Sequence, residues 1–259
     1  THTWTLAPLI GLIAKEPIDT KKLFVTGGSG GGVLTAALPS WSPTEFVAAA
    51  PLTALVTVSE VQAALGMEGG ACVDVAAACT GFIYALSVAH GWMMTGVARR
   101  VLVIGAESMS QIIDWTDRTT CILFGDGAGA VVLEAQPDSA RGIEAISLQA
   151  NGAFGPLLGT NGGVASTQQA GHLFMQGQEV FRHGVEKMAS ITVSTLEKAG
   201  KTLADADWLV PHQANSRMIR MIARQLRFPE EKCVVTVDKH ANTSAATIPL
   251  ALDVAARRS

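Results

Sequence analysis

The sequence predicts an α/β fold, and three observations support this prediction. The chain is 48% hydrophobic but only 5% aromatic, and it contains 26 glycines, which suits strands covered by closely packed helices. The apolar pattern of residues 69–107 is that of a strand, a helix and a second strand, typical of a parallel crossover unit. Residues 234–257 repeat the order of strand, loop and helix. We therefore expect these 259 residues to form one two-part domain or two tightly packed halves.

Composition also argues against several functional classes. The net charge of −3 gives no reason to expect a nucleic-acid partner. No uninterrupted apolar run is long enough to cross a bilayer, and no signal peptide opens the chain. We therefore expect a cytoplasmic protein without membrane insertion. The four cysteines lack metal-ligand spacing, which favours reduced thiols over a disulfide framework or a metal site; they are Cys72, Cys79, Cys121 and Cys233.

The first third of the chain carries the weakest patterns. Residues 5–13 are apolar, and residues 21–26 predict a strand that leads into a glycine run at 27–32. A strand that leads into a glycine run suggests a phosphate-binding loop. Residues 27–32, however, lack both the Lys-Ser/Thr ending of a P-loop and the dinucleotide spacing. We favour a flexible turn or linker. Residues 58–65 predict a short helix that ends at Gly66.

Cys79 lies at a junction between a strand and a helix. Residues 69–75 predict a short buried strand, and residues 82–95 carry apolar side chains at helical spacing. With Thr80 as the helix N-cap and Gly81 permitting close approach, the sulfur would lie beside free amide groups and the positive end of the helix dipole. That environment favours the nucleophilic thiolate. The alternative is a small hydrophobic side chain in a core.

The middle of the chain predicts another strand and a glycine-rich turn. Residues 101–107 are continuously apolar and predict a buried strand. The glycines of residues 124–130 suggest either a nucleotide loop or, as we prefer, a tight turn between paired strands where the backbone approaches another segment closely. Residues 137–142 predict a loop before the second half, and the polar residues 152–171 predict a surface loop that could border a substrate entrance.

The second half predicts two long helices, two short strands and a last helix. The helices span residues 177–199 and 216–226, the strands 208–211 and 234–237, and the last helix ends near residue 257. Four arginines recur on one face of the second helix, so this face is either a solvated surface or a docking site for an acidic partner; they are Arg217, Arg220, Arg224 and Arg227.

Three chemically active side chains follow predicted strands. Cys79, His212 and Asn242 each come after a strand and before a helix. The carboxyl ends of parallel strands gather ligands. The segments around Cys79 and Asn242 also echo each other, which suggests that duplicated halves bring these two residues close to a pseudo-twofold axis.

The segments around these side chains resemble a known family. Residues 76–82, 211–215 and 240–245 are similar to motifs of beta-ketoacyl-acyl-carrier-protein synthase III, an initiating condensing enzyme of the thiolase-like superfamily, and residues 116–118 and 124–130 also match. The resemblance runs from Val61 to Arg257. It implies a thiolase-like five-layered α-β-α-β-α sandwich of two pseudo-duplicated halves, residues 1–141 and 142–259, and a homodimer.

The resemblance implies a decarboxylative Claisen condensation that initiates type II fatty acid synthesis. Cys79 would take the acyl group from an acyl-CoA primer. Donors from His212 Nε2, as a neutral imidazole, and from Asn242 Nδ2 would then hold the enolate formed when malonyl-acyl carrier protein loses carbon dioxide. His240 has no donor role in the family pattern. No metal and no cofactor are expected; the thioesters of coenzyme A and of acyl carrier protein are substrates.

The resemblance also implies two binding surfaces. The carrier protein would dock on basic side chains, namely Arg182, Arg217 and Arg224. The pantetheine tunnel would be lined by Gly177, Phe181, Ala214 and Asn215. Leu123 and Phe124 would shape the acyl pocket or a subunit contact, with core packing as an equal alternative.

Both ends of the chain depart from the family pattern. Residues 1–53 are atypical, Ala54-Leu55 stands where a Phe-Pro pair is usual, and the last strands with their glycine loop are absent, so we expect a fold that is incomplete at both ends. Two alternatives follow: a non-catalytic thiolase-like module that binds acyl carrier protein, and a related condensing enzyme of polyketide or signal biosynthesis. The primer chain length stays open.

Overall fold

The computed structural model describes residues 24–26, 45–49, 58–136, 142–163, 166–169 and 171–257. The glycine run at 27–32, the apolar residues 5–13 and Ala54-Leu55 lie outside these described residues. The hypotheses about a phosphate loop and an atypical first segment therefore stay predictions. The boundary between two halves at residues 141 and 142 also stays a prediction.

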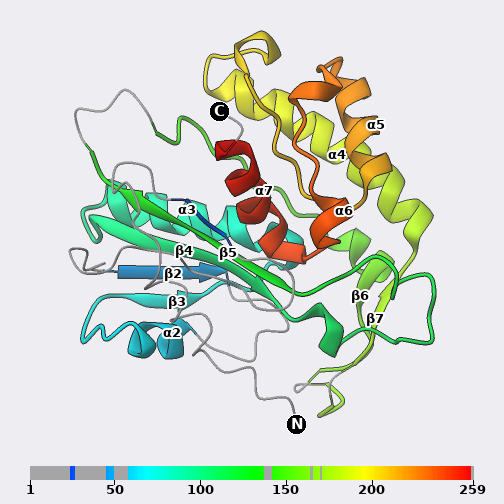
Figure 1. Ribbon diagram of the computed structural model, residues 1–259, viewed down its shortest axis with the longest axis horizontal. Helices are drawn as coiled ribbons and strands as arrows, with labels where there is room; N and C mark the ends of the chain where they lie inside the picture. Colours follow the sequence, from blue (N-terminus) through cyan, green and yellow to red (C-terminus); the bar gives the residue numbers. More distant parts are fainter. Residues whose placement is uncertain are drawn as a thin grey trace.

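A five-stranded sheet forms the centre of the described structure (Figure 1). Its order is β1-β5-β4-β2-β3, with β2 parallel to both β3 and β4, and β5 antiparallel to β4 and β1. The strands are β1 (Phe24–Thr26), β2 (Glu45–Ala49), β3 (Cys72–Asp74), β4 (Arg100–Glu107) and β5 (Gly127–Glu134). Helix α3 (Gly81–Met94) connects β3 to β4, which confirms the predicted crossover unit. Strand β3 is partly exposed, so the prediction that it is buried was wrong.

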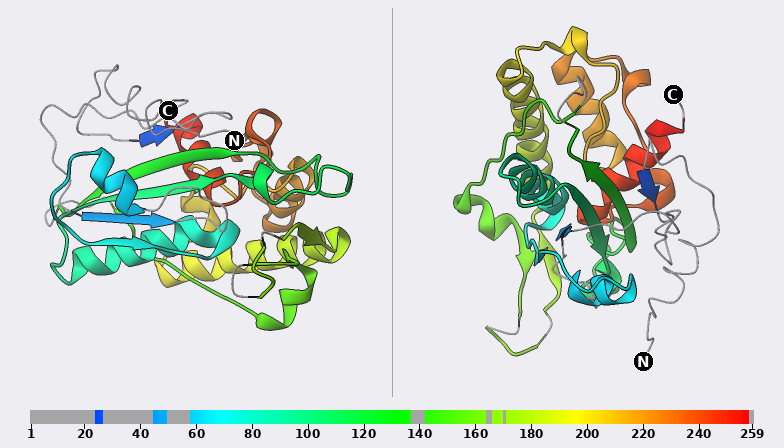
Figure 2. Two further views of the ribbon diagram at one scale, coloured as in Figure 1. Left: turned by 90° about the horizontal axis from the view of Figure 1, so that it is seen from below. Right: turned by 90° about the vertical axis from the view of Figure 1, so that its left-hand side faces the viewer.

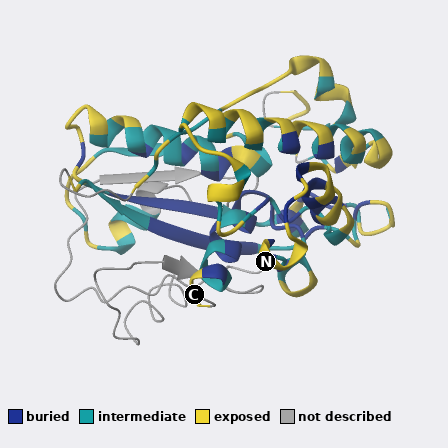
Figure 3. Cartoon of the chain, turned by 90° about the horizontal axis from the view of Figure 1, so that it is seen from above, coloured by how far each residue is buried: buried dark blue, intermediate teal, exposed yellow. Residues whose placement is uncertain are grey.

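Strands β4 and β5 are more buried than β3, the other strand of this sheet whose burial the structure describes (Figure 3). Val101 and Val103 of β4 form one apolar cluster with Phe82 of α3 and Val131 of β5. Side chains of α7 (Thr247–Ala256), including Ile248 and Leu252, pack against the same cluster. The apolar residues of β4 therefore hold together the two helices that follow Cys79 and Asn242.

Glycines let the segment around residues 243–250 lie directly on the sheet. A Cβ atom at Gly105 would lie 2.6 Å from the carbonyl oxygen of Ala245, and one at Gly129 would lie 2.9 Å from Cβ of Pro249. Real Cβ atoms do not come this close to other atoms. A larger residue at Gly105 or Gly129 would therefore push the segment around residues 243–250 away from the sheet. The prediction that the glycines in residues 124–130 mark a close backbone approach is confirmed. The predicted tight turn between paired strands is wrong, because residues 127–130 lie within β5 and residues 108–126 separate it from its partner β4.

The second half contributes helices more than strands. Helices α4 (Gly177–Lys198) and α5 (Ser216–Leu226) confirm both long-helix predictions. They pack against each other to one side of the large sheet (Figures 1 and 2). Residues 152–171 contain more structure than the predicted surface loop, namely a 3₁₀ turn η4 (Gly152–Leu157) and β6 (Leu158–Thr160), which pairs with β7 (Leu173–Met175).

The two strands predicted at 208–211 and 234–237 do not form. Only an isolated parallel bridge joins Leu209 and Cys233, and the short helix α6 (Val237–His240) begins where the second strand should end. The buried side chain of Gln213 donates to Val234 O at 3.0 Å and accepts from Thr236 N at 2.8 Å. Since a side chain takes the backbone groups that a neighbouring strand would need, the ladder ends after the bridge.

Two similar turns lead into α3 and α7. The 3₁₀ turns η2 (Ala78–Thr80) and η7 (Ser244–Ala246) each begin at a left-handed residue, Ala78 with φ 45° and Ser244 with φ 50°. The turn and helix of the predicted echo therefore exist, but its second strand at 234–237 does not form. The backbone also aligns Cys79 with Ala245, not with Asn242 as predicted. Shorter elements complete the described chain: α2 (Val58–Ala64), η3 (Met109–Gln111), η5 (Leu203–Asp205) and η6 (Glu230–Lys232). None of the described helices has the length and apolar character to span a membrane.

Candidate active site

Cys79 occupies the middle of the tight turn η2. Thr80 does not cap α3 as predicted, because its hydroxyl donates to Ala77 O at 2.8 Å and makes no bond to the first amides of the helix. Ala78 adopts a left-handed conformation that costs a non-glycine residue of order 1 kcal/mol or more. The turn thereby presents a half-buried Cys79 from a fixed and strained backbone.

The thiol of Cys79 is held in its protonated form. Burial raises its pKa, and the carboxylate of Glu107 raises it further, whereas a hydrogen bond with the Ser244 side chain lowers it. Desolvation disfavours the charged thiolate because a low-dielectric site cannot replace its hydration. The prediction of a ready-made thiolate was therefore wrong, and attack by this sulfur requires removal of its proton.

His212 is a neutral imidazole whose Nδ1 contacts a hydroxyl group. Its Nδ1 lies 2.7 Å from the hydroxyl oxygen of Thr247. Burial lowers the pKa of His212 to about 4, so the ring carries one proton at neutral pH. The next residue, Gln213, is 1% exposed and also donates to Pro211 O at 2.9 Å, which fixes the backbone on both sides of His212.

Asn242 is buried with its amide group oriented. Its Oδ1 accepts a hydrogen bond from Ser244 N at 3.0 Å, and its backbone pairs with Leu123 O and Gly125 N. Within the described residues, no acceptor lies within hydrogen-bond distance of Nδ2, so this group is available as a donor. Phe124, bridged to Asn242, is 8% exposed in a core cluster with Met109 and Ile113, which favours core packing over a role in the acyl pocket.

Ser244 connects the three side chains predicted to act together. Its side chain bonds to Cys79, its amide to Asn242 Oδ1, and its carbonyl accepts from Thr247 Oγ1, the atom that contacts His212. Glu107, at the end of β4, fixes the same turn by accepting from Ala245 N at 3.3 Å. Side chains remote in sequence therefore meet at the 242–247 segment, and this arrangement suits acyl transfer followed by stabilisation of an oxyanion.

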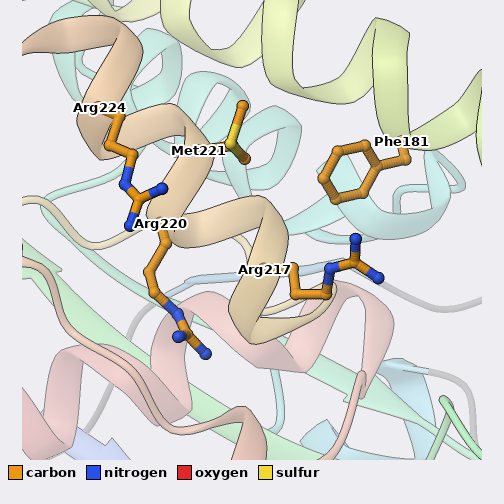
Figure 4. Close-up of a pocket in the computed structure, with 5 residues that line it drawn as sticks. All are labelled: Phe181, Arg217, Arg220, Met221 and Arg224. Carbon is orange, nitrogen blue, oxygen red and sulfur yellow. The ribbon is translucent and has the colours of Figure 1, made fainter.

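An open groove of about 390 Å³ lies between α4 and α5 (Figure 4). Phe181 projects from α4 and Met221 from α5 into the space between the helices, and the arginines extend from α5. The lining residues are Phe181, Arg217, Arg220, Met221 and Arg224. Two of the predicted docking arginines and one predicted tunnel residue therefore share one surface, whereas Cys79 does not line this groove.

The other predicted surface residues lie elsewhere. Arg182 pairs with Glu179 at 2.6 Å on α4. Asn215 is the N-cap of α5, its Oδ1 accepting from Met218 N at 2.8 Å, and Ala214 packs against the core between α4 and α5. Gly177 is the exposed first residue of α4. These contacts give Ala214 and Asn215 structural roles, and none of the four residues lines the groove.

The sequence reasoning missed four residues that support the site. They act through buried hydrogen bonds that connect segments far apart in the chain, and they are Glu107, Gln213, Ser244 and Thr247. The hydroxyls of Ser244 and Thr247, which follow Asn242 within five residues, offered the clearest signal in the sequence. Glu107 gave a weaker one as a carboxylate at the end of an apolar strand.

Comparisons of the sequence with known proteins agree with this site. Residues 73–152 match the family model 3-Oxoacyl-[acyl-carrier-protein (ACP)] synthase III, and residues 196–259 match the model of its C-terminal part. The chain is 55% identical over 203 residues to the beta-ketoacyl-[acyl-carrier-protein] synthase III of Erythrobacter litoralis, covering 78% of this chain and 63% of that protein. The protein of the same name from Ruegeria pomeroyi is 54% identical over 213 residues, covering 81% and 66%. The chain thus spans slightly less than two thirds of these relatives' length.

Solved structures share the fold. The 3-oxoacyl-[acyl-carrier-protein] synthase III of Aquifex aeolicus is 40% identical with a TM-score of 0.77, over 83% of this chain and 68% of that one. The priming β-ketosynthase from the R1128 polyketide biosynthetic pathway is 32% identical with a TM-score of 0.74, over 83% and 67%. The predicted α/β fold, of the thiolase-like type, is confirmed. The chain belongs to the 3-oxoacyl-[acyl-carrier-protein] synthase III family.

Proposed function

We propose that this chain condenses an acyl-CoA primer with malonyl-acyl carrier protein, with loss of carbon dioxide, to give a beta-ketoacyl-acyl carrier protein. One observation carries the proposal: a cysteine, a neutral histidine and an oriented asparagine amide all contact the 242–247 segment. The names of the relatives from Erythrobacter litoralis and Ruegeria pomeroyi support it.

In the first half-reaction Cys79 is acylated. The sulfur attacks the thioester carbonyl of acyl-CoA, a new carbon–sulfur bond forms, and the bond to the coenzyme A sulfur breaks. Burial opposes the thiolate of Cys79, but it does not oppose the product, because an acylated sulfur carries no charge. The desolvated surroundings of the sulfur therefore favour the acyl-enzyme over the free thiolate.

In the second half-reaction an enolate forms and attacks. The bond between the malonyl methylene carbon and its carboxylate breaks, carbon dioxide leaves, and the electron pair moves onto the thioester oxygen. Asn242 Nδ2 and His212 Nε2 hold this oxygen, and one such donor contributes about 3 kcal/mol to the transition state. The carbanion then bonds to the acyl carbon, and the sulfur of Cys79 leaves.

The basic face of α5 is the proposed dock for acyl carrier protein. Arg217, Arg220 and Arg224 line one groove with apolar walls from Phe181 and Met221. A carrier of opposite charge would be steered to this face and held by contacts that weaken with salt. Arg182 contributes less, because its charge is already paired with Glu179.

A product assay with cysteine variants tests the proposal. The chain is incubated with acyl-CoA and malonyl-acyl carrier protein, and product is measured by mass spectrometry together with the acyl mass on each cysteine. We expect Cys79→Ala to lose both signals and Cys121→Ala, the removal of another partly buried thiol, to keep them. A chain that binds carrier protein and gains no acyl mass on Cys79 would instead be the non-catalytic module.

A second candidate function is the priming of polyketide synthesis. The R1128 relative, named a priming β-ketosynthase, favours it. The rate of Cys79 acylation across acyl-CoA chain lengths and branching separates this candidate from fatty acid priming. A homodimer and a cytoplasmic location are also proposals, taken from the family resemblance, and light scattering on the purified chain tests the first.

A further inference from the structure

Thr247 lies between the imidazole of His212 and the turn that carries Ser244. It is the first residue of α7 and is 1% exposed. Its hydroxyl oxygen lies 2.7 Å from His212 Nδ1 and 2.8 Å from Ser244 O. One hydroxyl proton therefore faces two neighbours, and its position decides which ring nitrogen of His212 carries the imidazole proton.

The hydrogen bonds favour one arrangement. A carbonyl oxygen such as Ser244 O can only accept, and Thr247 Oγ1 has the geometry of a donor to it. The oxygen of Thr247 then accepts from His212 Nδ1–H, which gives a chain of two bonds and satisfies every polar atom in it. Turning the hydroxyl towards Nδ1 would leave one hydrogen bond where two are available.

We infer that Thr247 is a positioning residue that keeps the proton of resting His212 on Nδ1, so that Nε2 carries the lone pair of the ring. His212 Nε2 is then the base that removes the thiol proton during acylation. This inference rests on the proposed function and differs from the neutral donor role predicted for His212 from the sequence.

The proton balance closes over the two half-reactions. On acylation the proton of Cys79 moves to Nε2, and coenzyme A leaves as a thiolate that is protonated by solvent. The imidazolium then donates Nε2–H to the enolate oxygen, and a charged donor makes a stronger bond than a neutral one. After condensation the sulfur of Cys79 leaves as a thiolate and recovers the proton from Nε2.

Two features of the site agree with this assignment. Burial raises the pKa of the Cys79 thiol, so its attack needs a base. Burial also keeps His212 neutral at rest, with a pKa of about 4, so its lone pair is available at neutral pH. The negative charge of the enolate oxygen then stabilises the imidazolium in this buried site.

The tautomer can be read directly by nitrogen-15 NMR of His212 in the 259-residue chain without substrate. We expect the proton on Nδ1 in the unsubstituted chain and in Thr247→Ser, and a mixture of both tautomers in Thr247→Val. A proton found on Nε2 in the unsubstituted chain overturns the inference, whether or not the chain proves to be active. This readout therefore separates failure of the inference from failure of the proposed function.

Acylation kinetics give the second readout. General bases contribute roughly 10² to 10⁴ in rate, so we expect Thr247→Val to slow Cys79 acylation at least about tenfold, with Thr247→Ser restoring it. Thr192→Val is the matched control, because Thr192 also bonds a backbone oxygen in its own helix, Met188 O at 2.7 Å, outside the site. Acylation by Thr247→Val at the rate of this control also contradicts the inference, provided that both variants unfold at similar temperatures.

Discussion

The two turn-and-helix units of the chain share a backbone but carry different chemistry. In one, Ala78 precedes Cys79 and α3; in the other, Ser244 precedes Ala245 and α7. Both begin at a left-handed residue. The first unit supplies the nucleophile, whereas the second supplies Asn242, Ser244 and Thr247, which orient and donate. The comparison indicates that the same backbone, used twice, carries two different sets of side chains. The candidate active site forms where the η2–α3 unit contacts the η7–α7 unit.

The largest expected effect comes from removing the donor of the second unit. Asn242→Asp keeps an oxygen that accepts from Ser244 N, so the turn persists, but it replaces the Nδ2 donor with an oxygen. We expect malonyl decarboxylation to fall about a hundredfold or more, while acylation of Cys79 changes by only a few fold. Both rates are measured separately with the two substrates. Equal losses in the two rates would mean that Asn242 supports the structure alone.

The contact between the second unit and the sheet can be broken at Gly105. A Cβ atom in Gly105→Ala would meet Ala245 O at 2.6 Å, and overpacking of this kind costs about 1–3 kcal/mol of stability. Gly91→Ala is the matched control, since a Cβ at Gly91 within α3 meets no atom within 4 Å and alanine favours a helix. Chemical denaturation should show loss of stability in the first variant and none in the second. Equal unfolding midpoints would contradict close packing of η7 on β4.

The basic face of α5 gives a smaller effect on binding. We expect Arg217→Glu to weaken binding of acyl carrier protein about tenfold, with the difference shrinking as salt rises. Arg99→Glu changes the net charge equally at an exposed position outside the groove. Calorimetric titrations at two salt concentrations compare them. If both variants lose the same affinity, net charge rather than the groove determines binding.

A further expected effect is a pH dependence from His212. Its pKa falls from 6.5 to about 4 on folding because of burial, so the unfolded chain binds more protons between these values. The free energy of unfolding should therefore decrease as the pH falls from about 6.5 towards 4. His212→Asn should flatten this part of the stability curve, measured by urea unfolding at each pH. An unchanged curve would mean that His212 is not buried as described.

Sequence patterns predicted the elements that periodicity defines. Helices α3, α4, α5 and α7 and strand β4 appear where the apolar spacing placed them. The strand expected at 234–237 failed because the side chain of Gln213 takes its backbone groups, a long-range contact that no local pattern reveals. The internal echo was confirmed for its second helix and wrong for its second strand, and its alignment of Cys79 with Asn242 was shifted by three residues from Ala245.

The candidate site was predictable in its residues and not in its protonation. Cys79, His212 and Asn242 were predicted from motifs that resemble those of a known family, and all three meet at the 242–247 segment. The strands expected before His212 and Asn242 do not form, so the prediction of parallel strand ends does not explain their position. The thiolate predicted at Cys79 was wrong, since burial and Glu107 outweigh the hydrogen bond from Ser244. Desolvation depends on the whole surrounding structure, and the sequence near a residue does not report it.

A crystal structure of the chain after reaction with acyl-CoA tests the central claim most directly. The account predicts an acyl group on the sulfur of Cys79, with His212 Nε2 and Asn242 Nδ2 facing the same space beside η7. An acyl group on Cys72 or Cys121, or an acylated Cys79 with His212 and Asn242 turned away from it, would contradict the account.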